Sequence, residues 1–106
     1  MENRTFIDAL TACVVACNHC ADACLDEDNL DMMVDCIRTD HVCAEVCDTT
    51  AKVLLTSYDD VDALVKYCQQ ICTACADECE KHEHQHCQDC AKACRACEKE
   101  CEAFLA

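Results

Sequence analysis

The stretch CQQICTACADEC, residues 68–79, places cysteines at successive steps of four, three and four residues. The same steps recur over residues 13–24, steps of three and four alternate over residues 87–101, and steps of seven and four occur over residues 36–47. Residues at these spacings lie on one face of an α-helix, which has about 3.6 residues per turn. The sequence therefore predicts four helices, each with a stripe of thiols. The sixteen cysteines are Cys13, Cys17, Cys20, Cys24, Cys36, Cys43, Cys47, Cys68, Cys72, Cys75, Cys79, Cys87, Cys90, Cys94, Cys97 and Cys101.

The helices are predicted at residues 4–25, 29–55, 58–81 and 84–105. The chain contains no glycine and no proline, the residues on which most turns and strand-rich folds depend. Long helices joined by connections of a few residues must lie antiparallel to their neighbours. We therefore expect an all-α protein with a single domain over residues 1–106, folded as an antiparallel up-down-up-down four-helix bundle with a cysteine-lined core.

The breaks between the stripes are acidic or polar. Asp28 or Asn29 is a suitable N-cap for the second helix, and Ser57 with Asp60 resembles a capping box that opens the third. Residues 81–85 form a histidine-rich junction before the fourth helix.

The composition excludes several classes of function. Twenty-two acidic residues against eight basic ones give a formal net charge of −14, which repels nucleic acid and anionic lipid and suits a protein that handles cations. The longest apolar run falls far short of the roughly 20 residues that span a bilayer, and the first residues lack the pattern of an export signal. We therefore expect a cytoplasmic protein, and in that reducing compartment cysteines are more often metal ligands than disulfides.

The spacing of the thiols favours metal binding. Seven pairs of cysteines lie four residues apart, where helical Cβ atoms are roughly 5–6 Å from one another, whereas a disulfide requires about 3.5–4.5 Å. Two metal–sulfur bonds of about 2.3 Å each span such a gap. Disulfides between helices remain geometrically possible. A purely hydrophobic role is disfavoured, because so many small side chains would pack a bundle poorly.

The charge of such a core favours Cu(I) over other metals. Four thiolates around Zn(II) leave about two net negative charges per site in an already acidic protein. Cu(I) is soft and prefers thiolates, and roughly one copper per thiolate gives a nearly neutral core. Iron–sulfur clusters usually take cysteines from loops at shorter spacings. We therefore expect several Cu(I) ions per chain, with the sixteen cysteines as their ligands.

Alternating helix direction brings different residue types to the two ends of the bundle. At one end the stripes continue into ordinary core residues, and this end is predicted to be closed by apolar side chains. We term it the plug, and its expected members are Phe6, Leu10, Leu54, Leu55, Val61, Leu64, Phe104 and Leu105.

The opposite end, which we term the mouth, collects the remaining soft ligands. His82 and His86 are in phase with the thiol stripes, whereas His84 is expected to face solvent. Thioether, imidazole and thiolate groups all bind Cu(I), so we expect metal to enter here, with His82, His86 and Met33 as ligands. The expected mouth residues are Cys24, Met32, Met33, Cys36, Cys79, His82, His84, His86 and Cys87.

Three further polar residues call for an interpretation. Asp40 occupies a stripe position between Cys36 and Cys43, where an unpaired buried carboxylate is costly. It is expected to pair with a basic residue or a helix end, to touch metal, or to form a polar neck in the core. His19 and His41 fall off the stripes and are expected on the surface.

At this level of detail the chain resembles a known family. The stretches CIRTDHVCAEVC (36–47), CTACADECEKH (72–82) and HCQDCAKACRAC (86–97) resemble the bacterial copper-storage proteins, which are cysteine-rich four-helix bundles. The resemblance covers nearly the whole chain and is to the cytosolic branch. It implies a homotetramer of bundles whose cysteines line the core and bind many Cu(I) ions.

One part of the chain departs from the family pattern. The second helix carries only three cysteines, with Asp40 on its stripe, which puts the number of sites there in question. The family's use of methionine and histidine near the open end resembles Met32, Met33, His82 and His86.

These observations favour a cytoplasmic Cu(I) store that is not an enzyme and that supplies a cuproenzyme or copper carrier. The alternatives are a thiol redox protein, a zinc or cadmium buffer of the metallothionein type, and a structural bundle that binds a partner helix. The last would use apolar residues off the stripes, although self-association is their simpler use. These residues are Ile7, Val14, Val34, Ile37 and Ile71.

Overall fold

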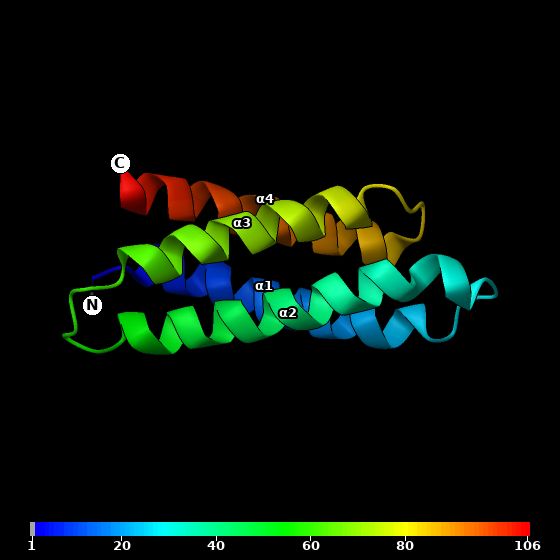
Figure 1. Ribbon diagram of the computed structural model, residues 1–106, viewed down its shortest axis with the longest axis horizontal. Helices are drawn as coiled ribbons and strands as arrows, with labels where there is room; N and C mark the ends of the chain where they lie inside the picture. Colours follow the sequence, from blue (N-terminus) through cyan, green and yellow to red (C-terminus); the bar gives the residue numbers. More distant parts are fainter. Residues whose placement is uncertain (1) are drawn as a thin grey trace.

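Four α-helices account for most of the computed structural model, which describes residues 2–106. They are α1 (Arg4–Cys24), α2 (Leu30–Leu54), α3 (Asp62–Cys79) and α4 (Gln85–Leu105). The helices run alternately up and down along one axis (Figure 1), and no strand occurs within this described part of the chain. The all-α antiparallel bundle predicted from the cysteine spacing is confirmed.

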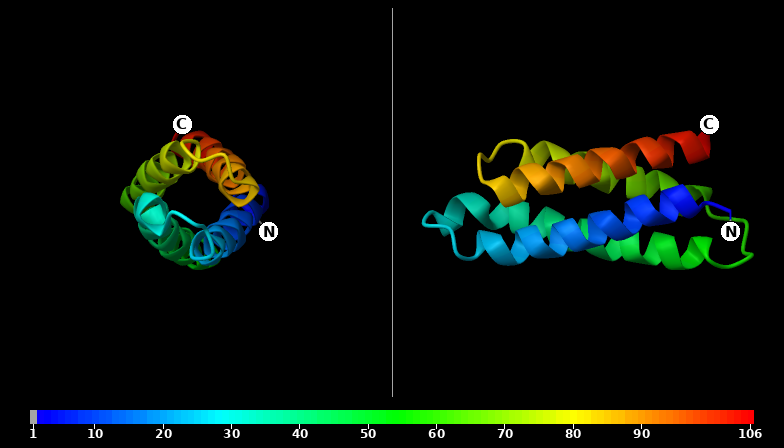
Figure 2. Two further views of the ribbon diagram at one scale, coloured as in Figure 1. Left: turned by 90° about the vertical axis from the view of Figure 1, so that its right-hand side faces the viewer. Right: turned by 180° about the vertical axis from the view of Figure 1, so that it is seen from behind.

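The helices stand at the corners of a square. Helix α1 packs against α2 and α4, and α3 packs against the same two helices. The diagonal pairs meet through side chains at the axis, as between Cys17 and Cys75 and between Cys47 and Cys97. Viewed end-on, the four helices surround one central axis (Figure 2). The bundle measures 46 × 20 × 19 Å. Each helix therefore turns one face toward a common axis, and side chains spaced three and four residues apart project into it.

The predicted start of the third helix is wrong. Helix α3 begins at Asp62, four residues after the expected start at residue 58, and Val61 occupies its N-cap position without a side-chain capping bond. The capping box expected from Ser57 and Asp60 is therefore not formed. The other helices begin and end within one residue of their predicted bounds, and α3 itself ends two residues early, at Cys79.

A threonine organises the connection that replaces the missing first turn of α3. The Thr56 hydroxyl donates a hydrogen bond to the Val53 carbonyl at 2.7 Å and accepts one from the Tyr58 N–H at 3.2 Å. Local bonds of this kind compete with helix formation. In the preceding connection, between α1 and α2, Asn29 occupies the N-cap position of α2; it is one of the two residues predicted there, although its side chain makes no capping bond.

The core consists mainly of sulfur. All sixteen cysteine side chains lie on the inner faces of the helices and are 0% exposed. Four of the five buried alanines directly follow a cysteine and so flank the stripes, and their small side chains permit close approach of neighbouring helices. These are Ala21, Ala44, Ala76 and Ala91.

Apolar side chains close one end of this sulfur core. Leu10 is fully buried, Val61 is nearly so, and the rings of Phe6 and Phe104 lie 5.5 Å apart between their centroids. Full burial of such side chains stabilises a fold by about 1.5–3 kcal/mol each. The plug is therefore present and supplies conventional hydrophobic stability.

Two predicted members of the plug are placed differently. Leu55 is 57% exposed, because it follows the last residue of α2 and turns outward at the C-cap. Leu64 is only half-buried, and the neighbouring Val65 takes the fully buried position.

Helix α1 is long and apolar enough to cross a membrane when judged by length and composition alone. Its buried face, however, carries Phe6, Leu10 and four cysteines that pack inside the bundle. The apolar character of α1 is thus that of a core helix.

Candidate metal centre

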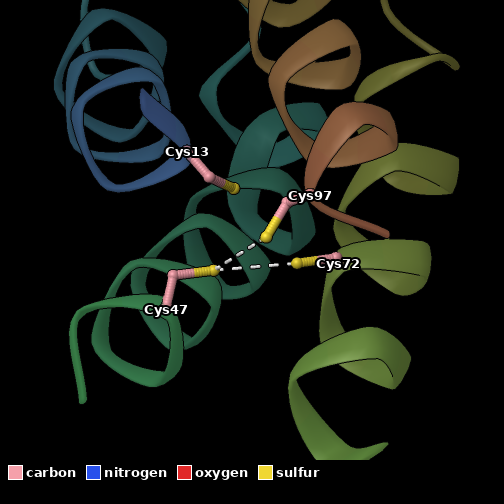
Figure 3. Close-up of side chains that lie close together, drawn as sticks. All are labelled: Cys13, Cys47, Cys72 and Cys97. Atoms are coloured by element: carbon pink, nitrogen blue, oxygen red, sulfur yellow. Dashed lines mark hydrogen bonds between the residues drawn. The ribbon is translucent and has the colours of Figure 1, made fainter. Parts of the chain in front are cut away.

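The thiols from all four helices meet along the bundle axis. In the group drawn in Figure 3, the Cys47 sulfur on α2 lies 3.6 Å from that of Cys72 on α3 and 4.0 Å from that of Cys97 on α4, with Cys13 of α1 beside them. Three sulfurs placed about 2.3 Å from one ion would be about 4.0 Å from one another. The sulfur spacing therefore already approaches that of a shared metal ion.

All sixteen thiols are free, and the structure describes every one of them. Pairs four residues apart, such as Cys13 with Cys17 and Cys43 with Cys47, have sulfurs 3.9 Å apart. A disulfide bond requires about 2.05 Å. The arrangement is one of packed thiols rather than of disulfides, which leaves each sulfur available as a ligand.

Sets of four ligand atoms lie within 4.8 Å of one another along the axis. Four of the five sets named below take ligands from three or four helices, so these sites exist only in the assembled bundle. Five of these sets are Cys13/Cys47/Cys72/Cys97, Cys13/Cys17/Cys43/Cys94, Cys17/Cys75/Cys90/Cys94, Cys20/Asp40/Cys79/Cys90 and Cys20/Cys24/His86/Cys87.

Close packing perturbs the acidity of the thiols. Hydrogen bonds with neighbouring thiols, together with burial, raise the pKa of Cys17 and Cys72. Near the mouth, hydrogen bonds from Cys36 and Cys79 lower the pKa of Cys20 to about 5. Because the thiolate is the metal-binding form, Cys20 is prepared for a metal ion. Cys17 and Cys72, and at the mouth Cys24 and Cys87, whose pKa burial raises, must first give up a proton.

Asp40 joins two groups of thiols. It is fully buried, its Oδ1 accepts hydrogen bonds from the thiols of Cys75, Cys90 and Cys79 at 3.2, 3.3 and 3.6 Å, and its Oδ2 lies 3.8 Å from the Cys36 sulfur. Burial strongly raises the pKa of Asp40, and ionisation of Cys90 or Cys75 would raise it further. Its partners are thus thiols rather than a basic residue or a helix end, and the carboxyl retains a proton at neutral pH.

His86 lies directly against the outermost thiols. Its Nδ1 is 3.4 Å from the Cys20 sulfur and 3.5 Å from the Cys87 sulfur, and its Nε2 lies 2.8 Å from Oε2 of Glu27. Burial lowers the pKa of His86, but the contacts with Cys20 and Glu27 outweigh burial and raise it. The structure thus brings an imidazole nitrogen to the sulfur column, as the stripe phase of His86 predicts.

Four other predicted mouth residues line a cavity of about 260 Å³, namely Met32, Met33, His82 and His84. Met33 is 2% exposed there and Met32 is 67% exposed, so only Met33 faces inward. The side chain of His82 is 11% exposed, and its Nε2 lies 2.8 Å from Oε2 of Glu78. Met33 and His82 therefore lie at the mouth, although the nearest partner of the His82 ring is a carboxylate and not a thiol.

The remaining histidines follow their predicted positions. His84 is 41% exposed and stacks on His86, with ring centroids 5.5 Å apart and planes 6° from parallel. His19 and His41 are exposed on the outer faces of α1 and α2, as expected for residues off the stripes.

Two carboxylates at the mouth were not found by reading the sequence. Glu78 is on α3, and His82 lies four residues later, just past the end of that helix. That spacing is a usable signal because residues four apart on a helix are neighbours. Glu27 lies 59 residues before His86, in the connection between α1 and α2, so no local pattern joins them.

Comparison with known proteins gives a consistent result. The whole chain, residues 1–106, matches the copper storage protein family. A cytosolic copper storage protein from Streptomyces lividans, solved during copper loading with five coppers, is 45% identical, with a TM-score of 0.92 over 95% of this chain and 89% of that one.

Two further relatives cover almost all of the chain. The Cu(I)-bound copper storage protein BsCsp3 is 39% identical, with a TM-score of 0.94 over 100% of both chains. The uncharacterized cysteine-rich protein YhjQ of Bacillus subtilis is 41% identical over 100 residues, which is 94% of this chain and 93% of that protein.

Proposed function

The chain belongs to the copper storage protein family and stores several Cu(I) ions in its bundle core, and we propose that its ligands are the sixteen thiols together with His86, His82 and Met33 at the mouth. The observation that carries this proposal is the continuous column of buried thiols, with sulfur–sulfur distances of 3.6–4.0 Å between different helices. Thiolate, imidazole and thioether are the soft ligands that Cu(I) prefers.

Charge balance supports copper in this setting. A fully buried thiolate is costly unless a cation compensates it. One Cu(I) per thiolate cancels the charge, whereas Zn(II) held by four thiolates leaves an excess of negative charge in a chain of net charge −14. The core can therefore accumulate many copper ions without accumulating charge.

The different chemistry of the two ends of the bundle supports entry of Cu(I) at the mouth. The plug closes one end, and the mouth presents His86 beside Cys20, the thiol whose pKa is lowered to about 5. We propose that Cu(I) binds first to the set formed by Cys20, Cys24, His86 and Cys87. It then moves inward by exchange between neighbouring thiolates, past Asp40 to the sets beyond it.

The related structures are copper storage proteins rather than enzymes. We propose that this chain likewise catalyses no reaction, is cytoplasmic as the Streptomyces relative is described to be, and releases its copper to a cuproenzyme or a copper carrier.

Self-association is a further part of the proposal. Apolar side chains on the outer face of α2 and the preceding connection line a groove of about 420 Å³, among them Leu25, Leu30 and Val34 at 57%, 44% and 39% exposure. Such a patch on a small domain often marks a protein interface. We propose a homo-oligomer, a tetramer by family resemblance.

Light scattering should show the mass of an oligomer, and Val34→Glu should weaken the association. A monomer at every concentration would contradict the proposed oligomer.

Titration of the reduced protein with Cu(I) tests storage directly. We expect many equivalents to bind before a competing chelator takes up copper, and saturation at one or two equivalents would refute the proposal. Replacing Cys13, Cys47, Cys72 and Cys97 by serine should lower the capacity by about a quarter, because it removes four of sixteen thiols. The same titration with Zn(II) should give weaker binding with fewer equivalents.

A further inference from the structure

A carboxylate from the connection between α1 and α2 reaches across the mouth to α4. Oε2 of Glu27 lies 2.8 Å from Nε2 of His86 and 3.4 Å from Nδ1 of His84. The side chains of Glu27 and His86 are only 26% and 13% exposed. Glu27 therefore holds the imidazole nearest the thiols from the side opposite to them.

The chemistry of the two groups restricts the state of the ring. A neutral imidazole carries one N–H, and an ionised carboxylate can only accept hydrogen bonds. The short contact with Glu27 therefore places the proton of neutral His86 on Nε2. The lone pair is then on Nδ1, the atom 3.4 Å from the Cys20 sulfur and 3.5 Å from the Cys87 sulfur.

We propose that Glu27 is a positioning residue for the mouth site: its hydrogen bond to Nε2 of His86 fixes the tautomer and orientation in which Nδ1 receives the first Cu(I). This inference rests on the proposed storage function and assigns a residue to it. Metal-binding histidines commonly donate their second ring N–H to a carboxylate, and loss of that partner typically weakens metal binding 10- to 100-fold.

The surroundings of His86 point to Glu27 rather than to another acidic residue. The nearby Glu78, on α3, contacts His82, which follows the same helix, rather than His86. Asp26 precedes Glu27 in the same connection but is exposed. His84 covers one face of the His86 ring by stacking, which leaves the ring edge at Nε2 for Glu27.

The first test measures the tautomer without copper. Long-range ¹H–¹⁵N NMR of the reduced protein, recorded at rising pH until the His86 signals no longer shift and the ring is neutral, distinguishes the two neutral forms. The wild type should show His86 protonated at Nε2. Glu27→Ala should show a mixture, and Glu27→Gln should keep the Nε2–H form, because its amide oxygen still accepts the bond. An unchanged tautomer in Glu27→Ala would overturn the proposal.

The second test measures affinity for the first equivalent of Cu(I) in competition with a chelator. Glu27→Ala should bind it at least about tenfold more weakly, with Glu27→Gln close to the wild type. Asp26→Asn removes the same charge from the same connection and should have no comparable effect. If Glu27→Gln and Asp26→Asn were both as weak as Glu27→Ala, general charge attraction would explain the result and positioning would be refuted.

The total capacity separates this inference from storage itself. Glu27→Ala should still bind the later equivalents, because the inner thiol sets are unchanged, and this also shows that the variant is folded. A wild type that saturates at one or two equivalents would refute storage, whereas the tautomer of His86 is measured with no copper present.

Discussion

The plug and the mouth close the same four helices with opposite chemistry. At the plug, Leu10 and Val65 are fully buried and two phenylalanine rings meet. At the mouth, His86 is held between thiols and the Glu27 carboxylate, and Met33 lines a cavity beside it. The difference shows that the plug supplies hydrophobic stability, while the mouth places polar groups and soft ligands beside the outermost thiols. This difference is the reason for proposing the mouth as the end at which metal enters.

The largest effect is expected from damage to the plug. Leu10→Ala should lower the free energy of unfolding by about 2–5 kcal/mol, because Leu10 is fully buried and its loss leaves a cavity. Denaturant unfolding of the reduced protein measures this. Leu55→Ala, at the same end but 57% exposed, should change stability by no more than about 0.5 kcal/mol. If Leu10→Ala also bound the first Cu(I) more weakly, the separate roles of the two ends, stability at the plug and metal binding at the mouth, would be contradicted.

The next largest effect is expected from acid. Each thiol that must be deprotonated costs about tenfold in apparent affinity per pH unit below its pKa. Hydrogen bonds with other thiols and burial raise the pKa of Cys17 and Cys72, so inner sites should weaken steadily as the pH falls from about 8 to about 6. Contacts with Cys36 and Cys79 lower the pKa of Cys20 to about 5, so this thiol is already ionised in that range. Burial raises the pKa of Cys24 and Cys87, the other two thiols of the mouth set, so the first equivalent should weaken with acid as well. Chelator competition measures the loss for each equivalent, and an affinity independent of pH would contradict binding by thiolates.

A smaller effect is expected at Asp40, which lies between the mouth thiols and the inner ones. Burial raises the pKa of Asp40 in the folded protein, so the folded state keeps a proton that the unfolded chain releases above about pH 4. Its contribution to stability is therefore complete below that pH and is lost as the pH rises. Asp40→Asn keeps an oxygen acceptor without the charge and should be more stable than the wild type by about 1–2 kcal/mol at pH 7.

The control for Asp40 is an exposed carboxylate on the same helix. Glu45→Gln should show no comparable gain, since Glu45 is exposed on α2. Denaturant unfolding at pH 4 and pH 7 tests this prediction, because the gain in unfolding free energy of Asp40→Asn over the wild type should vanish at the lower pH. An equal advantage at both pH values would point to packing rather than to ionisation.

The smallest effect is expected from histidines outside the mouth. His19→Ala and His41→Ala should leave copper capacity and first-equivalent affinity unchanged, because both side chains are exposed on outer helix faces. His86→Ala should weaken the first equivalent and leave the later ones. A similar loss in all three variants would show that imidazole acts anywhere on the surface, and that the mouth is not special.

Much of the fold could be predicted because cysteine itself carries the helical period. The stripes on α1, α3 and α4 fix both the helices and their inner faces. The start of α3 could not be predicted in this way, because the hydroxyl of Thr56 stabilises a local turn that competes with the expected cap at Ser57. Leu55 was misplaced for a related reason, since a residue just past a helix end no longer follows the helical phase.

The site was predictable only in part, for a reason of distance along the chain. The stripe phase identified His86, and the spacing of four residues could have identified Glu78. Glu27 and three of the four thiol partners of Asp40, which are Cys75, Cys79 and Cys90, come from other elements, up to 59 residues away.

The sequence by itself determined the four helices, the inward thiols and the preference for a soft monovalent metal, because these depend on local period and ligand chemistry. Only the tertiary structure decided which thiols meet, that Asp40 lies among four of them, and that Glu27 holds His86. Each of these depends on the register in which separate helices pack. The spacing of residues along the sequence does not specify that register.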